Sequence, residues 1–308
     1  LDIQHSVDHV LQHARAGQGA FLGHVADQED RRAALLGEAH QQRRTLARLG
    51  HALRAFVVLD CKESESRTAP PAPFTTSSLQ QAASNALKFT PKQTMQFAQE
   101  LYESGHITYM RTDSPNLSAE AVAEILAFCQ AHGWPLVDKP RIWKSKEGAQ
   151  EAHEAVRPTH IEVEEAGDTP DEQALYRLIR LRTLASQLAD AVYDVRTLRL
   201  AAALDGKEAV FEARGRVLRD PGWKVLLATD AATLDERDDD GDEPENPVPI
   251  LSQGTSVSPA SGRVLTKKTK PPTRFSEASL VRELENRGIG RPATFAAIVD
   301  TILKRSEE

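Results

Sequence analysis

The residues of this sequence best suited to chemistry are Tyr109, Arg111 and Asp113, which stand at alternate positions of one short stretch. A tyrosine hydroxyl is a weak nucleophile at neutral pH because its pKa is about 10. It becomes useful where cationic groups stabilise the phenolate and the charge that builds up on a phosphate. Residues two apart on a strand share a face, so Arg111 is placed to supply positive charge beside Tyr109. The alternative is a strand tyrosine whose hydroxyl simply lies at the protein surface.

A helix and a turn are expected to position this stretch. Thr90 and Gln93 have the form of a capping box, and Gly105 is a natural stop for the helix that follows it. The chain then reads as a short β-like run over 107–111. Turn-forming residues over 112–116 break that run. Tyr109 is therefore predicted to lie on a short rigid element between a helix and a turn.

Four stretches resemble one family, in the family's order along the chain. Residues 107–114, ITYMRTDS, resemble the active-site motif of type IA DNA topoisomerases of the bacterial topoisomerase I branch. The other three stretches are 73–81 (PFTTSSLQQ), 151–158 (EAHEAVRP) and 274–281 continuing to 288–292 (RFSEASLV, GIGRP). The resemblance implies that Tyr109 attacks a phosphodiester of single-stranded DNA and that Arg111 stabilises the phosphate. The strand would be resealed after strand passage without ATP, which relaxes negatively supercoiled DNA.

The same resemblance implies a set of DNA-binding residues. Asp113 would hold Arg111 or the turn in place, and His153 and Arg157 would contact phosphate near the tyrosine. The loop that contains Arg291 would bind the single strand, and the usual serine before Thr294 is Ala293 here. The residues assigned to DNA binding are Asp113, His153, Arg157, Arg291, Thr294 and Arg305.

Composition is that of an ordinary globular protein, with two cysteines, Cys61 and Cys129, that are too few for a disulfide scaffold or a zinc site. No apolar run approaches the roughly 20 residues needed to span a bilayer, so a cytoplasmic protein is expected. The resemblance implies that this protein is associated with the nucleoid. The net charge of −7 is unusual for a DNA-binding protein. However, residues 230–245 alone contribute −8, which leaves +1 for the rest of the chain. This acidic segment is predicted to be a solvated loop.

The expected fold class is α+β, with a helical domain that carries the active-site tyrosine inserted between two halves of a β-rich arch domain. The predicted domains are 1–68 (first half of the arch, poorly matched over 1–56), 69–192 (helical, with the tyrosine), 193–262 (second half of the arch, with the acidic loop 230–245) and 263–308 (a truncated helical DNA-binding domain). Helices are predicted over 75–87, 90–104 and 118–132, from Thr169, and from Ser276 to Arg287. Strands are predicted over 55–59, 192–200, 209–217, 223–227, 249–251 and 255–257, with a linker over 63–73.

The family also implies a Toprim domain whose acidic cluster holds Mg²⁺, and nothing in residues 1–56 resembles it. The sequence is therefore interpreted as the central part of a topoisomerase, with the nucleophile but no metal ligands. Its partners would be single-stranded DNA and the missing Toprim and C-terminal segments of the same enzyme, and the isolated fragment would be inactive. The alternative is a non-catalytic single-stranded DNA-binding remnant that lacks Toprim.

Overall fold

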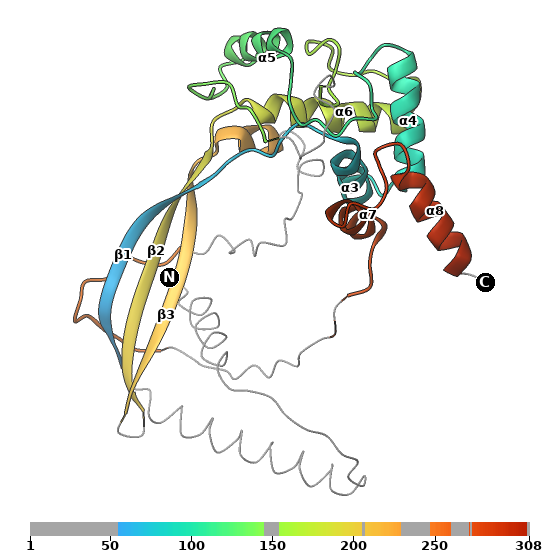
Figure 1. Ribbon diagram of the computed structural model, residues 1–308. Helices are drawn as coiled ribbons and strands as arrows, with labels where there is room; N and C mark the ends of the chain where they lie inside the picture. Colours follow the sequence, from blue (N-terminus) through green and yellow to red (C-terminus); the bar gives the residue numbers. More distant parts are fainter. Residues whose placement is uncertain are drawn as a thin grey trace, which may run out of the picture. The chain divides into compact units, whose positions relative to one another are not determined.

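The computed structural model describes residues 55–144, 154–204, 207–228, 247–259, 271 and 273–306. These residues form an α+β protein with one four-stranded sheet and six α-helices (Figure 1). They divide into two compact units. The strand-rich unit contains the described residues within 1–66, 193–219 and 243–271, and the helical unit contains those within 67–192, 220–242 and 272–308. The arch assignment and the boundaries of the four predicted domains stay predictions.

The sheet has the strand order β3-β2-β1-β4. Its strands are β1 (Phe56–Thr68), β2 (Ala191–Leu204), β3 (Lys207–Asp220) and β4 (Ser256–Val257). The short β4 pairs antiparallel with the start of β1, where Phe56 faces Val257. A small buried cluster of Val58, Leu198, Ala213 and Val248 packs the strand-rich unit.

Strand β1 is longer than its sequence predicts, because charged side chains on neighbouring strands pair with it. The prediction ended the strand at Leu59 and began a linker at Glu63, which is wrong for residues 60–68. Arg199 Nη1 lies 3.1 Å from Asp60 Oδ2, and Arg196 Nε lies 2.7 Å from Glu63 Oε1. Opposite charges across strands stabilise a sheet, so a polar stretch that resembles a linker becomes strand once its partners are present.

Five of the six helices begin where the sequence predicts a helix. The six helices are α3 (Thr76–Ala86), α4 (Pro91–Glu103), α5 (Ala119–Ala131), α6 (Pro170–Ser186), α7 (Glu277–Asn286) and α8 (Phe295–Ser306). The predicted capping box of α4 is present, since the Thr90 hydroxyl accepts from the Gln93 N–H and the Gln93 side chain accepts from the Thr90 N–H. None of the helices in the described part of the chain is long and apolar enough to cross a membrane.

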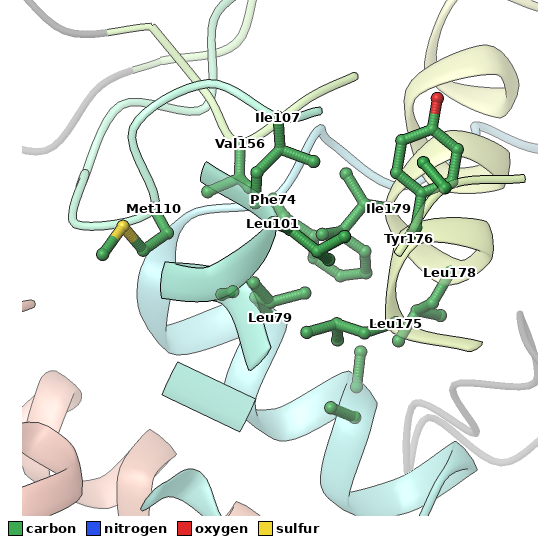
Figure 2. Close-up of a cluster of buried hydrophobic side chains, with 14 residues drawn as sticks. Phe74, Leu79, Leu101, Ile107, Met110, Val156, Leu175, Tyr176, Leu178 and Ile179 are labelled. Carbon is green, nitrogen blue, oxygen red and sulfur yellow. The ribbon is translucent and has the colours of Figure 1, made fainter. Parts of the chain in front are cut away.

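Helix α6 is the centre of the helical unit's core. Leu175, Leu178 and Ile179 are completely buried against residues of α3 and α4 (Figure 2). Arg180 and Arg182 are buried as well, whereas Arg177 is exposed, and Arg180 Nε donates to the Ile161 carbonyl at 2.9 Å. The guanidinium of Arg180 also lies over the ring of Phe128. The predicted role of this helix in core packing is confirmed, and its two buried arginines donate to backbone carbonyls inside the protein.

Two predicted strands are absent. Residues 249–251 have no regular structure, and the segment predicted as a strand over 223–227 lies in a 3-10 helix, η1 (Gly222–Ala228). The Trp223 N–H donates to the Ala189 carbonyl, and its indole Nε1 donates to the Thr68 carbonyl at 3.0 Å. Gly222 has φ +49°, and a Cβ there would lie 2.2 Å from the Asp190 carbonyl oxygen. The turn at this glycine and the anchored Trp223 account for the tight helix in place of a strand.

Candidate active site

The segment that carries Tyr109 leaves helix α4 through a glycine turn. Gly105 has φ +76°, which favours glycine because it has no Cβ. The Gly105 N–H donates to the Tyr102 carbonyl at 2.9 Å, and the His106 N–H donates to the Leu101 carbonyl at 2.8 Å. These two bonds form a Schellman motif, which ends the helix and turns the chain back along it. The predicted stop at Gly105 is confirmed.

Side chains alternate between buried and exposed from Tyr109 to Ser114, as in a strand. Met110, Thr112 and Ser114 are buried, whereas Tyr109 is 42% exposed and Arg111 is also exposed. Met110 and the nearby Ile107 belong to the core cluster on α6, so the inward side chains anchor the segment (Figure 2). The predicted β-run over 107–111 is nevertheless wrong, because only Ile107 forms an isolated bridge, with Pro158.

The segment is held on one side by residues that lie far along the chain. The Thr108 N–H donates to the Arg157 carbonyl at 2.8 Å. The Thr108 hydroxyl donates to the Ala155 carbonyl at 2.8 Å and accepts from the Arg157 N–H at 3.0 Å. The residue before Tyr109 is therefore fixed by three hydrogen bonds to the 155–157 segment.

A third segment, at the start of α3, completes the arrangement. The Val156 N–H donates to the Phe74 carbonyl at 2.8 Å, and the Thr76 N–H donates to the Thr112 carbonyl at 2.9 Å. Three of the four stretches recognised in the sequence, 73–81, 107–114 and 151–158, thus meet through backbone hydrogen bonds. The fourth stretch reaches them through α7, because Arg282 Nε donates to Gln81 Oε1 on α3 at 2.9 Å.

Side chains of helix α4 contact the two exposed side chains, Tyr109 and Arg111. The rings of Tyr102 and Tyr109 lie edge to face with centroids 5.4 Å apart. One turn earlier on α4, Gln99 Oε1 accepts from Arg111 Nη2 at 3.5 Å, and Gln99 Nε2 donates to Glu103 Oε1 at 2.6 Å. Gln99 is thus a side-chain partner of Arg111, and Asp113 is partly exposed in the turn. The assignment of Asp113 to holding Arg111 or the turn in place stays a prediction.

Arg157 forms a bidentate ion pair with Glu154. Its Nε is 2.9 Å from Glu154 Oε2, its Nη2 is 3.1 Å from Glu154 Oε1, and its Nη1 donates to the Pro158 carbonyl. Glu154 Oε2 also accepts from the Ser118 N–H at the start of α5. Sequence reasoning missed this pair, although its two residues are only three positions apart. The assignment of Arg157 to phosphate contact stays a prediction, and such contact would share a guanidinium already bound to Glu154.

His153 lies outside the described residues, so its predicted place beside Tyr109 stays a prediction. Trp143 and Ala155, which lie before and after the undescribed stretch 145–153, are both bound to Asn116. The Asn116 side chain donates to the Trp143 carbonyl at 2.9 Å and accepts from the Trp143 N–H at 2.8 Å. The Asn116 carbonyl accepts from the Ala155 N–H at 2.7 Å. Asn116, whose role sequence reasoning missed, therefore fixes both of these flanking residues to the tyrosine turn.

The predicted single-strand loop connects α7 to α8. Gly288 has φ +68° and ends α7, and the Arg291 N–H donates to the Thr294 hydroxyl at 2.8 Å. The Thr294 hydroxyl also donates to the Arg291 carbonyl at 3.1 Å, so its visible role is to close the turn. Arg291 is exposed, and so is Arg305 in the last turn of α8. Helices α7 and α8 pack against α3 and α4, the two helices that flank the tyrosine segment.

The comparisons with known proteins agree with this arrangement of motifs. The sequence pattern of the DNA topoisomerase family matches residues 17–306. The chain belongs to the bacterial type IA DNA topoisomerase family. It is 52% identical over 255 residues to "DNA topoisomerase I, plasmid" of Xylella fastidiosa, covering 82% of this chain and 38% of that protein. It is 44% identical over 256 residues to DNA topoisomerase 1 of Salmonella typhimurium, covering 81% of this chain and 28% of that protein.

A solved topoisomerase has the same fold. Full-length topoisomerase I from Thermotoga maritima superposes with a TM-score of 0.68 and 32% sequence identity, over 93% of this chain and 44% of that one. The topoisomerase chain described here therefore spans well under two thirds of the length of these three relatives.

The residues that the structure describes do not fit the Mg²⁺ that the resemblance to this family implies. Within the ranges that the structure describes, no group of three or more His, Cys, Asp or Glu side chains is placed to hold a metal ion. Of the carboxylates close to the tyrosine segment, Glu154 binds Arg157 and Glu103 accepts from Gln99. We derive no step through a metal ion from these residues.

Proposed function

We propose that this chain carries the nucleophile of a type IA DNA topoisomerase, an isomerase of DNA, and that the nucleophile is Tyr109. The observation that supports the proposal most is the outward presentation of Tyr109 and Arg111 from a segment whose alternate side chains are buried. A nucleophile must be held in a fixed place and must reach a polymer that comes from outside. Tyr109 meets both conditions within a family whose members are named DNA topoisomerases.

In the proposed reaction, the Tyr109 oxygen attacks the phosphorus of one phosphodiester in single-stranded DNA. A bond forms between Tyr109 Oη and phosphorus, and the bond from phosphorus to the 3′-oxygen breaks. The phenol loses its proton and the 3′-oxygen gains one, which leaves a 5′-phosphotyrosine and a free 3′-hydroxyl. The covalent link conserves the energy of the phosphodiester, so attack by that hydroxyl reseals the strand without ATP. Passage of the other strand in between relaxes negative supercoils.

Arg111 would supply positive charge to the phosphate during attack. Its guanidinium is exposed on the same side of the segment as Tyr109, and Gln99 gives it a partner that leaves its charge unneutralised. Fixed positive charge at the point where negative charge develops is an effective way to lower a barrier. The remaining contacts to single-stranded DNA are assigned to Asp113, His153, Arg157, Arg291, Thr294 and Arg305.

We assign the Mg²⁺ requirement of the reaction to residues outside those described here. Their chemistry would be charge stabilisation at the phosphate and the leaving oxygen. This chain's own contribution is then the nucleophile, its arginine and part of the DNA-binding surface. A non-catalytic DNA-binding remnant, the alternative from sequence, is not favoured by the comparisons, in which the matched relatives are named as topoisomerases.

The test is covalent trapping in the full-length enzyme. Enzyme and labelled single-stranded oligonucleotide are incubated with Mg²⁺, denatured quickly and run on a denaturing gel. Tyr109→Phe keeps the ring and removes the attacking oxygen, so it is expected to abolish the adduct and to change DNA affinity less than about twofold. Tyr102→Phe is the matched control, since it removes the hydroxyl of the adjacent exposed tyrosine. An adduct of normal yield from Tyr109→Phe would show that another residue attacks.

A further inference from the structure

We propose that Thr76 is a positioning residue for catalysis, one that sets where Tyr109 and Arg111 stand relative to a bound phosphate. The inference rests on the proposed function of Tyr109 and adds to it a residue from a different helix. Thr76 is the first residue of α3 and is completely buried. Because its side chain is buried against the backbone of the tyrosine segment, its effect would pass through that backbone.

The Thr76 hydroxyl makes more contacts with the tyrosine segment than a packing role requires. Its oxygen lies 2.7 Å from the Met110 carbonyl and 3.0 Å from the Thr112 carbonyl, either of which can accept its single proton. The same oxygen accepts from the Thr112 N–H at 2.9 Å. The backbone N–H of Thr76, left without a partner inside the helix by its place at the N-terminus, donates to the Thr112 carbonyl.

These hydrogen bonds hold the residues on both sides of Arg111, and the first of them, Met110, directly follows Tyr109. Met110 and Thr112 are the buried residues on either side of Arg111, and fixing their peptide groups holds the Arg111 side chain outward. Thr108 fixes the other side of Tyr109 through its bonds to Ala155 and Arg157. Hydrogen bonds therefore hold the backbone on both sides of Tyr109, from Thr76 on α3 and from the 155–157 segment.

Replacing the Thr76 hydroxyl by a methyl group would remove the hydrogen bonds that hold the Met110–Thr112 side of the segment. In Thr76→Val the methyl would lie against the Met110 carbonyl, and the Thr112 N–H would lose its acceptor in a buried place. The segment would have to shift to relieve both changes. Because a displacement of about 1 Å in an attacking group can slow a reaction by about a hundredfold, the rate of attack should fall far more than DNA affinity.

The chain offers a matched control in Thr183. This residue is also buried, but its hydroxyl donates only to the Ile179 carbonyl one turn earlier in its own helix α6, at 2.9 Å. Thr183→Val therefore removes a buried hydroxyl of the same type without touching the tyrosine segment. Thr76→Ser keeps the hydroxyl and should restore the rate. Thr76→Ala, which puts no methyl against the two carbonyls, gives the same comparison if the valine variant does not fold.

The experiment measures three quantities in the full-length enzyme and its variants. They are the single-turnover rate of adduct formation at saturating single-stranded oligonucleotide with Mg²⁺, the dissociation constant for that oligonucleotide, and the midpoint of thermal unfolding. For Thr76→Val we expect a rate at least about tenfold below wild type, with the dissociation constant changed less than about twofold. Thr76→Ser should stay within about threefold of the wild-type rate, and Thr183→Val should lose thermal stability without losing rate.

The outcomes separate the inference from the proposed function. Equal rate losses in Thr76→Val and Thr183→Val, or a Thr76→Val defect confined to the dissociation constant, would overturn the role of Thr76 alone. A wild-type enzyme that forms no adduct dependent on Tyr109 would overturn the proposed function and this inference with it. A slow Thr76→Val enzyme with normal affinity, rescued by serine, supports both.

Discussion

The ring of Tyr102 lies edge to face against the ring of Tyr109, with centroids 5.4 Å apart and an angle of 67° between the planes. Tyr102 comes from the last turn of α4, while Tyr109 follows the Gly105 turn that reverses the chain. The two tyrosine residues are exposed to nearly the same extent, 41% and 42%. The Tyr102 ring at the end of α4 thus limits the orientations that the Tyr109 ring can adopt.

The first prediction concerns this contact between the Tyr102 and Tyr109 rings. Aromatic pairs of this geometry contribute about 0.5–1.5 kcal/mol beyond the area that they bury. Tyr102→Ala in the full-length enzyme should therefore slow adduct formation by roughly threefold to tenfold. Tyr102→Phe keeps the ring contact and should react at the wild-type rate. Alanine and phenylalanine variants with the same rate would mean that the ring contact does not orient Tyr109.

The second prediction concerns the ion pair between Glu154 and Arg157. Glu154→Gln weakens a two-pronged charged interaction and the bond to the Ser118 N–H, so we expect a loss of about 1–2 kcal/mol in the free energy of unfolding. The measurement is urea denaturation of the 308-residue chain. Glu162→Gln is the control, because its pairing with His160 is exposed and should contribute less than about 0.5 kcal/mol. Similar losses in both variants would contradict a structural role for the Glu154 pair.

The third prediction concerns the 308-residue chain by itself. Its predicted phosphate contacts are Arg111, His153, Arg157 and Arg291, so binding to single-stranded DNA should be weak and sensitive to salt. With about 0.7 in log K lost per phosphate neutralised, a plot of log K against log salt should have a slope of about −2 to −3. The chain should not cleave DNA with Mg²⁺ supplied, because its described residues provide no metal site. A covalent product dependent on Tyr109 would contradict the assignment of the metal to other residues.

The fourth prediction follows from the pKa of Cys129. Burial raises the pKa of this thiol from 9.0 to about 12, an effect that the nearby Arg180 guanidinium partly opposes. Because the folded pKa lies above the unfolded one, the thiol's contribution to stability is complete below pH 9 and is lost as the pH rises towards 12. A thiol reagent at pH 8–9 should therefore label the partly exposed Cys61 and spare Cys129 until the chain unfolds. Equal labelling of both cysteines in the folded chain would contradict this environment.

Local signals in the sequence predicted the helices well. The capping residues Thr75, Thr90, Ser118, Thr169 and Ser276 all begin helices, since a side chain that caps a helix acts on residues within its own first turn. The exposure of Tyr109 and Arg111 on the same side of the segment was also predicted, because residues two apart on a strand share a face. In contrast, the length of β1 and the partners of Thr76, Thr108 and Asn116 depend on residues tens of positions away. Nothing in the spacing of a single sequence specifies such contacts.

The central claim is that Tyr109 forms the covalent bond to DNA, and peptide mapping of the trapped adduct tests it most directly. The full-length enzyme is trapped on a short oligonucleotide with Mg²⁺, denatured and digested with protease and nuclease, and the peptide that keeps a nucleotide mass is sequenced by mass spectrometry. The predicted result is a 5′-nucleotide on the peptide that contains Tyr109, with the mass on the tyrosine itself. A nucleotide on any other residue, including the neighbouring Tyr102, would contradict the account.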